Sequence, residues 1–282
     1  MKLKNSTNKI RDLSLEIDKL RIPNHIAVIM DGNGRWGVNK GLTRSHGHNK
    51  GVSVLKKIIK VSKKLGVKVL TVYAFSTENW TRPLEEVKFL LNLFEKVLEK
   101  EIDELNKELI RIKFIGDLSP FSEDLRKKFI EAENITHYND QFTLNICTNY
   151  GGRQELVKVA RELSRKSISG EIKPDQINEE MFESHLLTCD FQDPDLLIRT
   201  SGEKRISNFL LWQLAYSEIY ITDVLWPEFD ENEFYKAIID YQSRKRRFGG
   251  IKSGSNQSLK SSFFLGNTCL LYTSPSPRDS SK

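Results

Sequence analysis

The residues best suited to chemistry follow a short apolar run near the start of the chain. The stretch Asp31-Gly-Asn-Gly-Arg-Trp-Gly37 combines a carboxylate, three glycines and an arginine. Glycines at this spacing after a strand let backbone N–H groups approach phosphate oxygens. A carboxylate beside a phosphate is repulsive unless a cation lies between them, and Mg²⁺ commonly binds through one carboxylate together with substrate phosphates. The pattern therefore predicts a magnesium-diphosphate site at Asp31 rather than a solvated turn.

The same glycines also match the G-x-G-x-x-G fingerprint of dinucleotide-binding enzymes. Arg35 and Trp36 are bulky at positions where a fingerprint helix packs closely on its strand, and Asp31 would face the phosphates of the dinucleotide. Glu78 could supply the acid that this class places near the end of its second strand. A dinucleotide-dependent oxidoreductase is therefore the alternative enzyme class, and metal dependence separates the two hypotheses.

Further polar and cationic residues follow other apolar runs. The stretch Ser76-Thr-Glu-Asn-Trp-Thr-Arg82 is too rich in polar groups to be only a helix start. Arg199 and Arg205 flank a glycine turn, and their forked guanidinium groups suit a second phosphate. Glu218 precedes the sixth run and is either structural or a second metal ligand.

A histidine pair, His46 and His48, lies beside Arg44. In a helix, residues two positions apart point in different directions, so this pair does not predict a metal site. His48, together with Arg44, is instead expected to donate hydrogen bonds to a diphosphate.

The elements that position these residues alternate between β-rich and helical patterns. This alternation predicts an α/β fold, a single domain with a six-stranded, mostly parallel sheet flanked by helices. Ligands of such sheets bind beyond the carboxyl ends of the strands, which is where the candidate residues lie. We expect strands at 25–30, 67–75, 110–115, 142–147, 196–199 and 219–222, and helices near 45–64, 84–109, 120–133, 153–168, 178–187, 206–216 and 230–247.

The expected helix at 84–109 is apolar on more than one side over its first half. A core helix explains its main apolar stripe. A helix that lines an apolar cavity would show the same pattern, so both interpretations stay open.

Composition narrows the possible classes of protein. The 282 residues are 38% hydrophobic and 29% charged, without an apolar run long enough to span a membrane. Three cysteines are too few and too scattered for a disulfide framework or a zinc site, which favours a reducing cytosol. The net charge of +6 is not clustered, which argues against a nucleic-acid partner. We expect a helical leader at 1–22, a catalytic domain at 23–250 and a disordered, Ser-rich extension at 251–282.

These motifs together resemble the cis-prenyltransferase family, in particular its bacterial undecaprenyl diphosphate synthases. The resemblance runs from about Pro23 to Gly250 and includes the segments already quoted. Like that family, the chain has no DD-x-x-D motif. Further matching segments are Asn149-Tyr-Gly-Gly-Arg153, Asp195-Leu-Leu-Ile-Arg-Thr-Ser-Gly202, Tyr216-Ser-Glu218, Leu225-Trp-Pro227 and Arg247-Phe-Gly249.

The resemblance implies a role for each candidate residue in elongating farnesyl diphosphate with isopentenyl diphosphate. Asp31 would hold Mg²⁺ on the starter diphosphate, Glu218 would complete the metal site, and Asn79 would accept or relay a proton. The starter's phosphates would be bound by Gly32, Asn33, Gly34, Arg35, Arg44 and His48, with Trp36 beside them. The junction between the substrates would be lined by Ser76, Thr77, Glu78, Trp80 and Arg82. Isopentenyl diphosphate would be bound by Arg199, Arg205, Ile206 and Ser207.

The resemblance also implies a hydrophobic tunnel, walled by helices that include 84–109, into which the product grows. The implied assembly is a homodimer formed through the C-terminal part of the domain, with Arg247-Phe-Gly249 reaching the partner's site. The implied location is the cytoplasm or the membrane surface, with the product delivered to the membrane. A non-catalytic partner subunit is the alternative outside the enzymes, but such subunits degrade the aspartate-glycine motif, which is intact here.

Overall fold

The computed structural model describes residues 13–245. Its sheet has six strands in the order β3-β4-β2-β1-β5-β6, and every neighbouring pair is parallel. The strands are β1 His25–Ile29, β2 Val69–Ser76, β3 Ile110–Ile115, β4 Phe142–Tyr150, β5 Leu196–Arg199 and β6 Glu218–Ile221. The α-helices are α1 Asn33–Asn39, α2 Arg44–Leu65, α3 Leu84–Lys107, α4 Glu123–Ile135, α5 Gly152–Ile168, α6 Glu179–Glu183 and α7 Glu231–Ser243. The predicted α/β class and all six predicted strands are confirmed.

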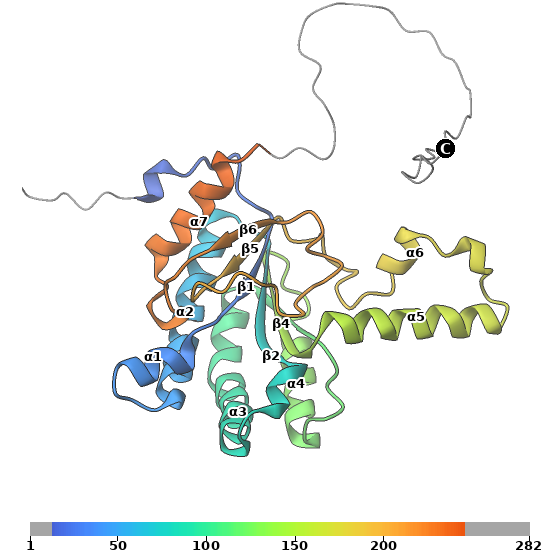
Figure 1. The fold of residues 1–282 in the computed structure, drawn as a ribbon, viewed down its shortest axis with the longest axis horizontal. Coiled ribbons are helices and arrows are strands. Elements are labelled where there is room, and N and C mark those ends of the chain that lie inside the picture. Colours follow the sequence, from blue (N-terminus) through green and yellow to red (C-terminus); the bar gives the residue numbers. More distant parts are fainter. Residues whose placement is uncertain (1–12, 246–282) are drawn as a thin grey trace, which may run out of the picture. The chain divides into compact units, whose positions relative to one another are not determined.

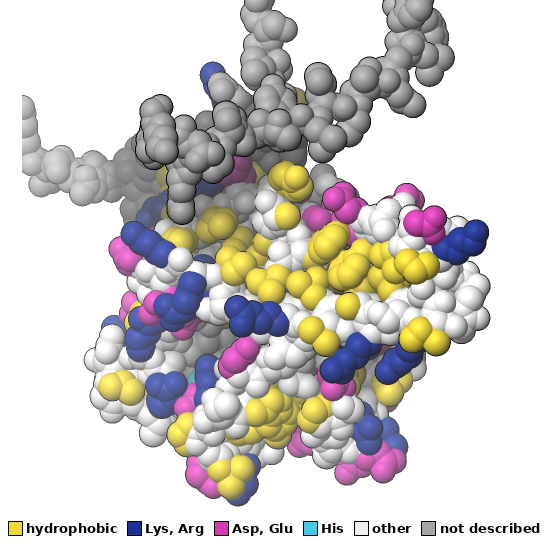
Figure 2. All heavy atoms as spheres, turned by 45° about the vertical axis from the view of Figure 1, so that its right-hand side comes forward, with side chains coloured by type: hydrophobic (Ala, Val, Ile, Leu, Met, Phe, Trp, Pro, Cys, Tyr) yellow, Lys and Arg dark blue, Asp and Glu magenta, His cyan; other side chains and the backbone are white. Residues whose placement is uncertain are grey.

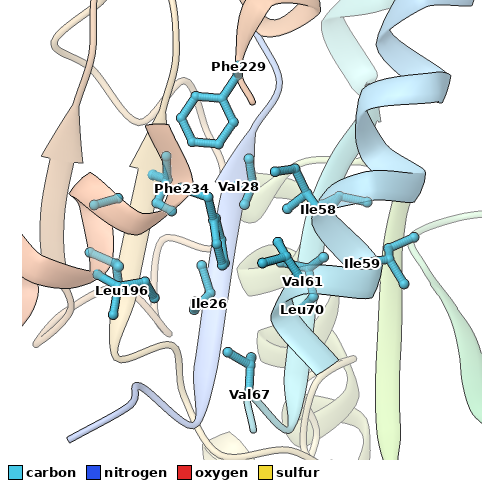
Figure 3. Close-up of a cluster of buried hydrophobic side chains, with 14 of the residues drawn as sticks. Ile26, Val28, Ile58, Ile59, Val61, Val67, Leu70, Leu196, Phe229 and Phe234 are labelled. Atoms are coloured by element: carbon cyan, nitrogen blue, oxygen red, sulfur yellow. The ribbon is translucent and has the colours of Figure 1, made fainter. Parts of the chain in front are cut away.

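The sheet is covered on both faces because its buried strands alternate their apolar side chains between the faces. Ile26 and Val28 of β1 pack with side chains of α2 and α7, such as Ile58 and Phe234 (Figure 3). Ala27, between them in sequence, packs in a separate cluster on the other face. Figure 1 shows α2 and α7 close together, and α5 extending away from the sheet. Packing on both faces of the sheet thereby fixes the positions of the strand ends.

The expected helix at 206–216 is wrong. The structure has a series of turns there instead. Ser207, Asn208 and Leu210 have φ angles of 48°, 60° and 44°. These left-handed conformations cannot continue a right-handed helix. The apolar spacing that suggested a helix arises because Phe209, Leu210 and Leu214 cover the second face of the sheet.

Two further differences concern the ends of the chain and the first glycine-rich segment. The glycine-rich stretch after β1 forms the short helix α1, which was not predicted as a helix. Of the expected leader at 1–22, the structure describes only residues from 13 onward, which begin with the 3-10 helix η1 at Leu13–Glu16. The Arg247-Phe-Gly249 motif and the expected extension at 251–282 lie outside the described residues.

Candidate functional site

A cavity of about 540 Å³ lies beyond the carboxyl ends of β1, β2 and β5, where the strand pattern predicted the site. Thirteen of the predicted site residues line it. They are Asp31, Gly32, Asn33, Gly34, Arg35, Arg44, His48, Ser76, Glu78, Asn79, Arg82, Arg199 and Ser207.

A sharp turn of the backbone places Asp31 just beyond the C-terminal end of β1. Gly32 follows it with φ 102°, a left-handed conformation that glycine adopts without strain. A Cβ atom at Gly32 would also lie 2.8 Å from Cδ2 of Leu225, so the position has no room for a side chain. The turn lets the Gly32 N–H donate to Oδ1 of Asp31 at 2.7 Å. The carboxylate is thereby fixed at the cavity.

Two arginines neutralise Asp31. Nη2 of Arg199 donates to its Oδ2 at 3.0 Å, and Nη2 of Arg35 lies 3.5 Å from its Oδ1. Burial by itself raises the pKa of Asp31, but the hydrogen bond and charge of Arg199 and the charge of Arg35 outweigh it. The pKa of Asp31 is therefore lower than its ordinary value, and the carboxylate is ionised at neutral pH.

Arg199 connects this carboxylate to the turn after β5. Its side chain is only 4% exposed, and its Nη1 donates to Oγ of Ser207 at 2.8 Å and to the carbonyl oxygen of Arg205. Arg35 reaches the same region, where its Nη2 donates to Oγ of Ser201. The turn predicted to hold a second anion is thus organised around a buried guanidinium that also contacts Asp31.

A second set of cations lies at the start of α2 and α3. Arg44 and His48 come from α2, and Arg82 precedes α3; all three surround the carboxylate of Glu86. Burial lowers the pKa of His48 and outweighs the opposing charge of Glu86. Together with Arg44 and Arg82, His48 forms a wall of the cavity that is rich in hydrogen-bond donors.

The loop after β2 is fixed by its own hydrogen bonds and by Asn208. Oδ1 of Asn79 accepts from the N–H of Ser76 at 3.0 Å, which caps the 3-10 helix η2 at Thr77–Thr81. Nδ2 of Asn208 donates to Oε1 of Glu78 at 2.9 Å. Burial opposes ionisation of Glu78, but this hydrogen bond and others hold the pKa of Glu78 below its ordinary value. Asn79 and Glu78 therefore have defined orientations at the cavity.

Several predicted residues do not line the cavity. Trp36 donates from Nε1 to Glu228, while Trp80 packs on Phe75 and donates to Asn149. The side chain of Arg205 is 63% exposed and paired with Glu203. Thr77 lies in η2, and Ile206 packs on the apolar cluster under the turns after β5. Trp36, Thr77, Trp80 and Ile206 lie outside the cavity wall, and the exposed Arg205 lies in the same turn region as Ser207, which does line it.

Glu218 does not lie at the cavity, where its expected role as a metal ligand would require it. It begins β6 opposite Leu196, three residues before the Arg199–Ile221 pair at the other end of these strands. Its carboxylate accepts from Nη1 of Arg244 at 2.7 Å. The structure does not bring it to Asp31, because parallel pairing puts the two residues at opposite ends of the sheet. The expectation of one metal site shared by these two carboxylates is not met within this chain.

Sequence reasoning missed Tyr73, Leu90 and Asn208, which line the cavity, and Glu86, which gathers the cations. The i,i+4 spacing of Arg82 and Glu86 is a signal that could have revealed their ion pair. Asn208 gave no comparable signal, since its contact with Glu78 depends on tertiary structure.

The residues at the cavity could hold Mg²⁺ only if a substrate supplied further oxygen ligands. Within residues 13–245 no group of three or more His, Cys, Asp or Glu side chains could hold a metal. Asp31 offers a hard, ionised oxygen ligand that is 31% exposed. A single carboxylate plus phosphate oxygens is a usual ligand set for Mg²⁺.

Comparisons with known proteins identify the family of this chain. The isoprenyl transferase of Prochlorococcus marinus subsp. pastoris is 66% identical over 264 residues, which cover 94% of this chain and 96% of that protein. The ditrans,polycis-undecaprenyl-diphosphate synthase ((2E,6E)-farnesyl-diphosphate specific) of Haemophilus influenzae is 49% identical over 84% of this chain and all of its own length.

Solved structures and a family model point to the same family of proteins. Lavandulyl diphosphate synthase from Lavandula x intermedia, in complex with dimethylallyl diphosphate, matches with a TM-score of 0.80 and 39% identity over 83% of this chain and all of that one. A probable undecaprenyl diphosphate synthase from Campylobacter jejuni matches with a TM-score of 0.67 and 33% identity over 80% of this chain and 98% of that one. The family model described as "Putative undecaprenyl diphosphate synthase" matches residues 29–249. The dinucleotide-dependent alternative is thereby set aside, and the chain belongs to the undecaprenyl diphosphate synthase family of prenyltransferases.

Proposed function

We propose that this chain is a magnesium-dependent cis-prenyltransferase that condenses isopentenyl diphosphate onto farnesyl diphosphate. Repeated condensation would give a long-chain polyprenyl diphosphate such as undecaprenyl diphosphate, a precursor of a glycosyl carrier lipid. The observation that carries the proposal is a single cavity with two sets of cations, each paired with its own carboxylate. Two diphosphate substrates require two such sets. The Haemophilus relative is named as specific for (2E,6E)-farnesyl diphosphate, which supports farnesyl diphosphate as the starter.

In this proposal the set around Glu86 binds the starter diphosphate. Arg44, His48 and Arg82 supply donors, and Gly34 leaves space beside them, because a Cβ atom there would lie 2.5 Å from Cζ of Arg44. The set around Arg199, with Ser207 and Arg205, binds isopentenyl diphosphate. Holding both substrates in one cavity replaces a bimolecular encounter by positioning.

Asp31 would hold Mg²⁺ against the starter diphosphate, with the remaining ligands from phosphate and water. When bound, the ion would neutralise charge on the diphosphate as it leaves. The ionised state of Asp31 supports this role, and the buried guanidinium of Arg199 keeps its carboxylate oriented. Glu218 is left out of this site because it lies at the opposite end of its strand.

Asn79 would orient the reacting groups rather than act as the base. A neutral amide is a weak base, and its Oδ1 already accepts from Ser76. A diphosphate oxygen is the better candidate to accept the proton from the isopentenyl carbon.

The growing chain would extend along α3. Leu90 of α3, with Ile29 and Met30, gives the cavity an apolar part, and Phe75 and Val87 pack with Leu90. Each isoprene unit adds five carbons, and burying them contributes roughly 2–4 kcal/mol. This retention of intermediates favours processive growth in a hydrophobic tunnel, whose depth would limit product length.

The proposed assembly is a homodimer formed through the C-terminal part of the domain, with the product delivered to the membrane. Apolar side chains gather on the face of the molecule that Figure 2 shows. On α5, Val157 and Ile168 are exposed. Within residues 13–245 no helix is long and apolar enough to cross a membrane. Catalysis in the cytoplasm or at the membrane surface fits these observations.

The test is an assay of the purified protein with farnesyl diphosphate, labelled isopentenyl diphosphate and Mg²⁺, with products separated by chain length. A ladder ending in long products that disappears with a chelator is expected. Incorporation that a chelator does not affect would contradict magnesium dependence. No incorporation by the folded protein alone would favour a non-catalytic partner subunit.

A further inference from the structure

Glu86 lies in the first turn of α3 and is the common partner of two arginines and a histidine. Its carboxylate accepts from Nε and Nη2 of Arg44 at 2.9 and 3.2 Å and from Nη1 of Arg82 at 3.0 Å. Nε2 of His48 lies 3.5 Å from Oε1 of Glu86. The side chain of Glu86 is only 11% exposed, whereas Arg44 and Arg82 are 52% and 35% exposed and keep part of each guanidinium open to solvent.

The three partners line the cavity, whereas Glu86 is not among its lining residues. Glu86 therefore contacts these donors without forming part of the cavity wall. Arg44 and His48 belong to α2, and Arg82 belongs to the loop before α3. No other carboxylate is recorded in contact with these three side chains among the described residues, so Glu86 alone joins the two segments at this point.

Arg44 is held on its other side by Gly34. A Cβ atom at Gly34 would lie 2.5 to 2.8 Å from three atoms of the guanidinium, which means that the guanidinium rests directly on the Gly34 backbone. Arg44 is thus fixed between a carboxylate and the phosphate-binding loop. Bidentate pairing of this kind sets the plane of a guanidinium as well as its position.

The guanidinium groups of Arg44 and Arg82 repel each other in this wall, and a neighbouring anion offsets that repulsion. In the absence of a diphosphate, Glu86 is the group that supplies this negative charge. From this arrangement we infer that Glu86 is a positioning residue that holds Arg44, Arg82 and His48 in the orientation that receives the starter's diphosphate. The inference rests on the proposed function and deepens it.

Glu85 provides a matched control. It lies in the same first turn of α3, where a negative charge stabilises the helix dipole, but it is 86% exposed and pairs only with Lys88 at 3.4 Å. Glu85→Gln removes the same charge from the same helix turn without touching the cavity. A difference between variants at the two positions therefore reports the contacts of Glu86 rather than a general effect on α3.

The experiment measures binding of farnesyl diphosphate and of isopentenyl diphosphate by titration calorimetry without magnesium, alongside melting temperatures. Glu86→Gln should weaken farnesyl diphosphate binding by about tenfold or more, since misoriented arginines lose charge-assisted bonds. Binding of isopentenyl diphosphate and the affinities of Glu85→Gln should stay at the parent values.

A second variant guards against failure of Glu86→Gln to fold. Glu86→Asp keeps the charge but draws the carboxylate back by one methylene, so it should also weaken farnesyl diphosphate binding. Parent-like affinity in either folded variant, or equal weakening for both substrates, would overturn the inference. Turnover of the parent is measured separately, so a parent that binds farnesyl diphosphate without making product would refute the proposed function and not the role of Glu86.

Discussion

Arg199 and Asp31 lie at the ends of neighbouring strands and are joined by a hydrogen bond of 3.0 Å between Nη2 and Oδ2. The parallel register puts Ile29 of β1 opposite Arg199 of β5, so Asp31 comes just beyond that pair. Because Nη1 of Arg199 also reaches Ser207, one buried side chain connects the proposed metal ligand with the proposed isopentenyl site. Changes at either residue should therefore affect both halves of the cavity.

Replacement of Asp31 should remove most of the activity. Asp31→Ala deletes the proposed magnesium ligand and leaves the cationic groups of Arg199 and Arg35 without their carboxylate. We expect turnover to fall on the order of a thousandfold or more, equivalent to about 4 kcal/mol of transition-state stabilisation. The measurement is initial rate against magnesium concentration. Activity within tenfold of the parent at saturating Mg²⁺ would contradict the assignment.

The two arginines of the second anion site should behave differently. Arg205 is 63% exposed and Arg199 is 4% exposed. Arg205→Ala should raise the KM for isopentenyl diphosphate about tenfold or more while leaving the melting temperature unchanged. Arg199→Ala should lower both activity and melting temperature, because it opens a space at a buried position and leaves the half-buried Asp31 and Ser207 without a donor. Steady-state kinetics for each substrate, with thermal melts, check this. An unchanged KM for isopentenyl diphosphate in Arg205→Ala would show that the site is misplaced.

The fold was largely predictable because a buried parallel sheet leaves a strong pattern in sequence. Continuous apolar runs gave the six strands, and the strand-end rule located Asp31, Asn79 and Arg199 at one cavity. The turns at 206–216 were not predictable from apolar spacing, because their left-handed residues are fixed by tertiary contacts. The position of Glu218 depended on strand register, which the sequence pattern does not determine.

Asn208 should prove important for turnover although it is not among the predicted site residues. It donates to Glu78 and to Gln154, and its Oδ1 accepts from the N–H of Arg153 at 2.8 Å. Glycine adopts the φ of 60° found at Asn208 without strain, so Asn208→Gly removes only the side chain that holds Glu78. We expect kcat to fall about tenfold, the cost of roughly one hydrogen bond to a charged group.

Asn208→Ala separates this effect from backbone strain. It lacks the same side-chain contacts, but alanine is disfavoured at positive φ, so the variant should lose about 1 kcal/mol more stability than Asn208→Gly. Denaturant unfolding of both variants measures the difference. Parent-like kcat in Asn208→Gly would show that the contact with Glu78 has no role in catalysis.

The stability of the protein should depend on pH through His25, at the opposite end of β1. The ring is buried; Nδ1 donates to the carbonyl oxygen of Gln192, and Nε2 accepts from Oγ1 of Thr71 at 2.7 Å. Thr71 also accepts from Nδ2 of Asn145, so its hydroxyl hydrogen is directed to His25. Burial lowers the pKa of His25 to about 4, although the Gln192 hydrogen bond and the charge of Asp195 oppose the shift.

The sign of the pH effect follows from this lowered pKa. The unfolded chain binds a proton at His25 below the ordinary pKa of about 6.5, whereas the folded protein does not until about pH 4. The contribution of neutral His25 to the free energy of unfolding is therefore complete above pH 6.5. It is lost as the pH falls toward 4, by up to about 3 kcal/mol. His25→Gln should have a smaller fall in unfolding free energy between pH 7 and pH 4.5 than the parent. His137→Gln, at an exposed histidine, should keep the parent's slope. Urea unfolding across this range measures all three, and identical slopes in the parent and His25→Gln would show that His25 does not control this acid sensitivity.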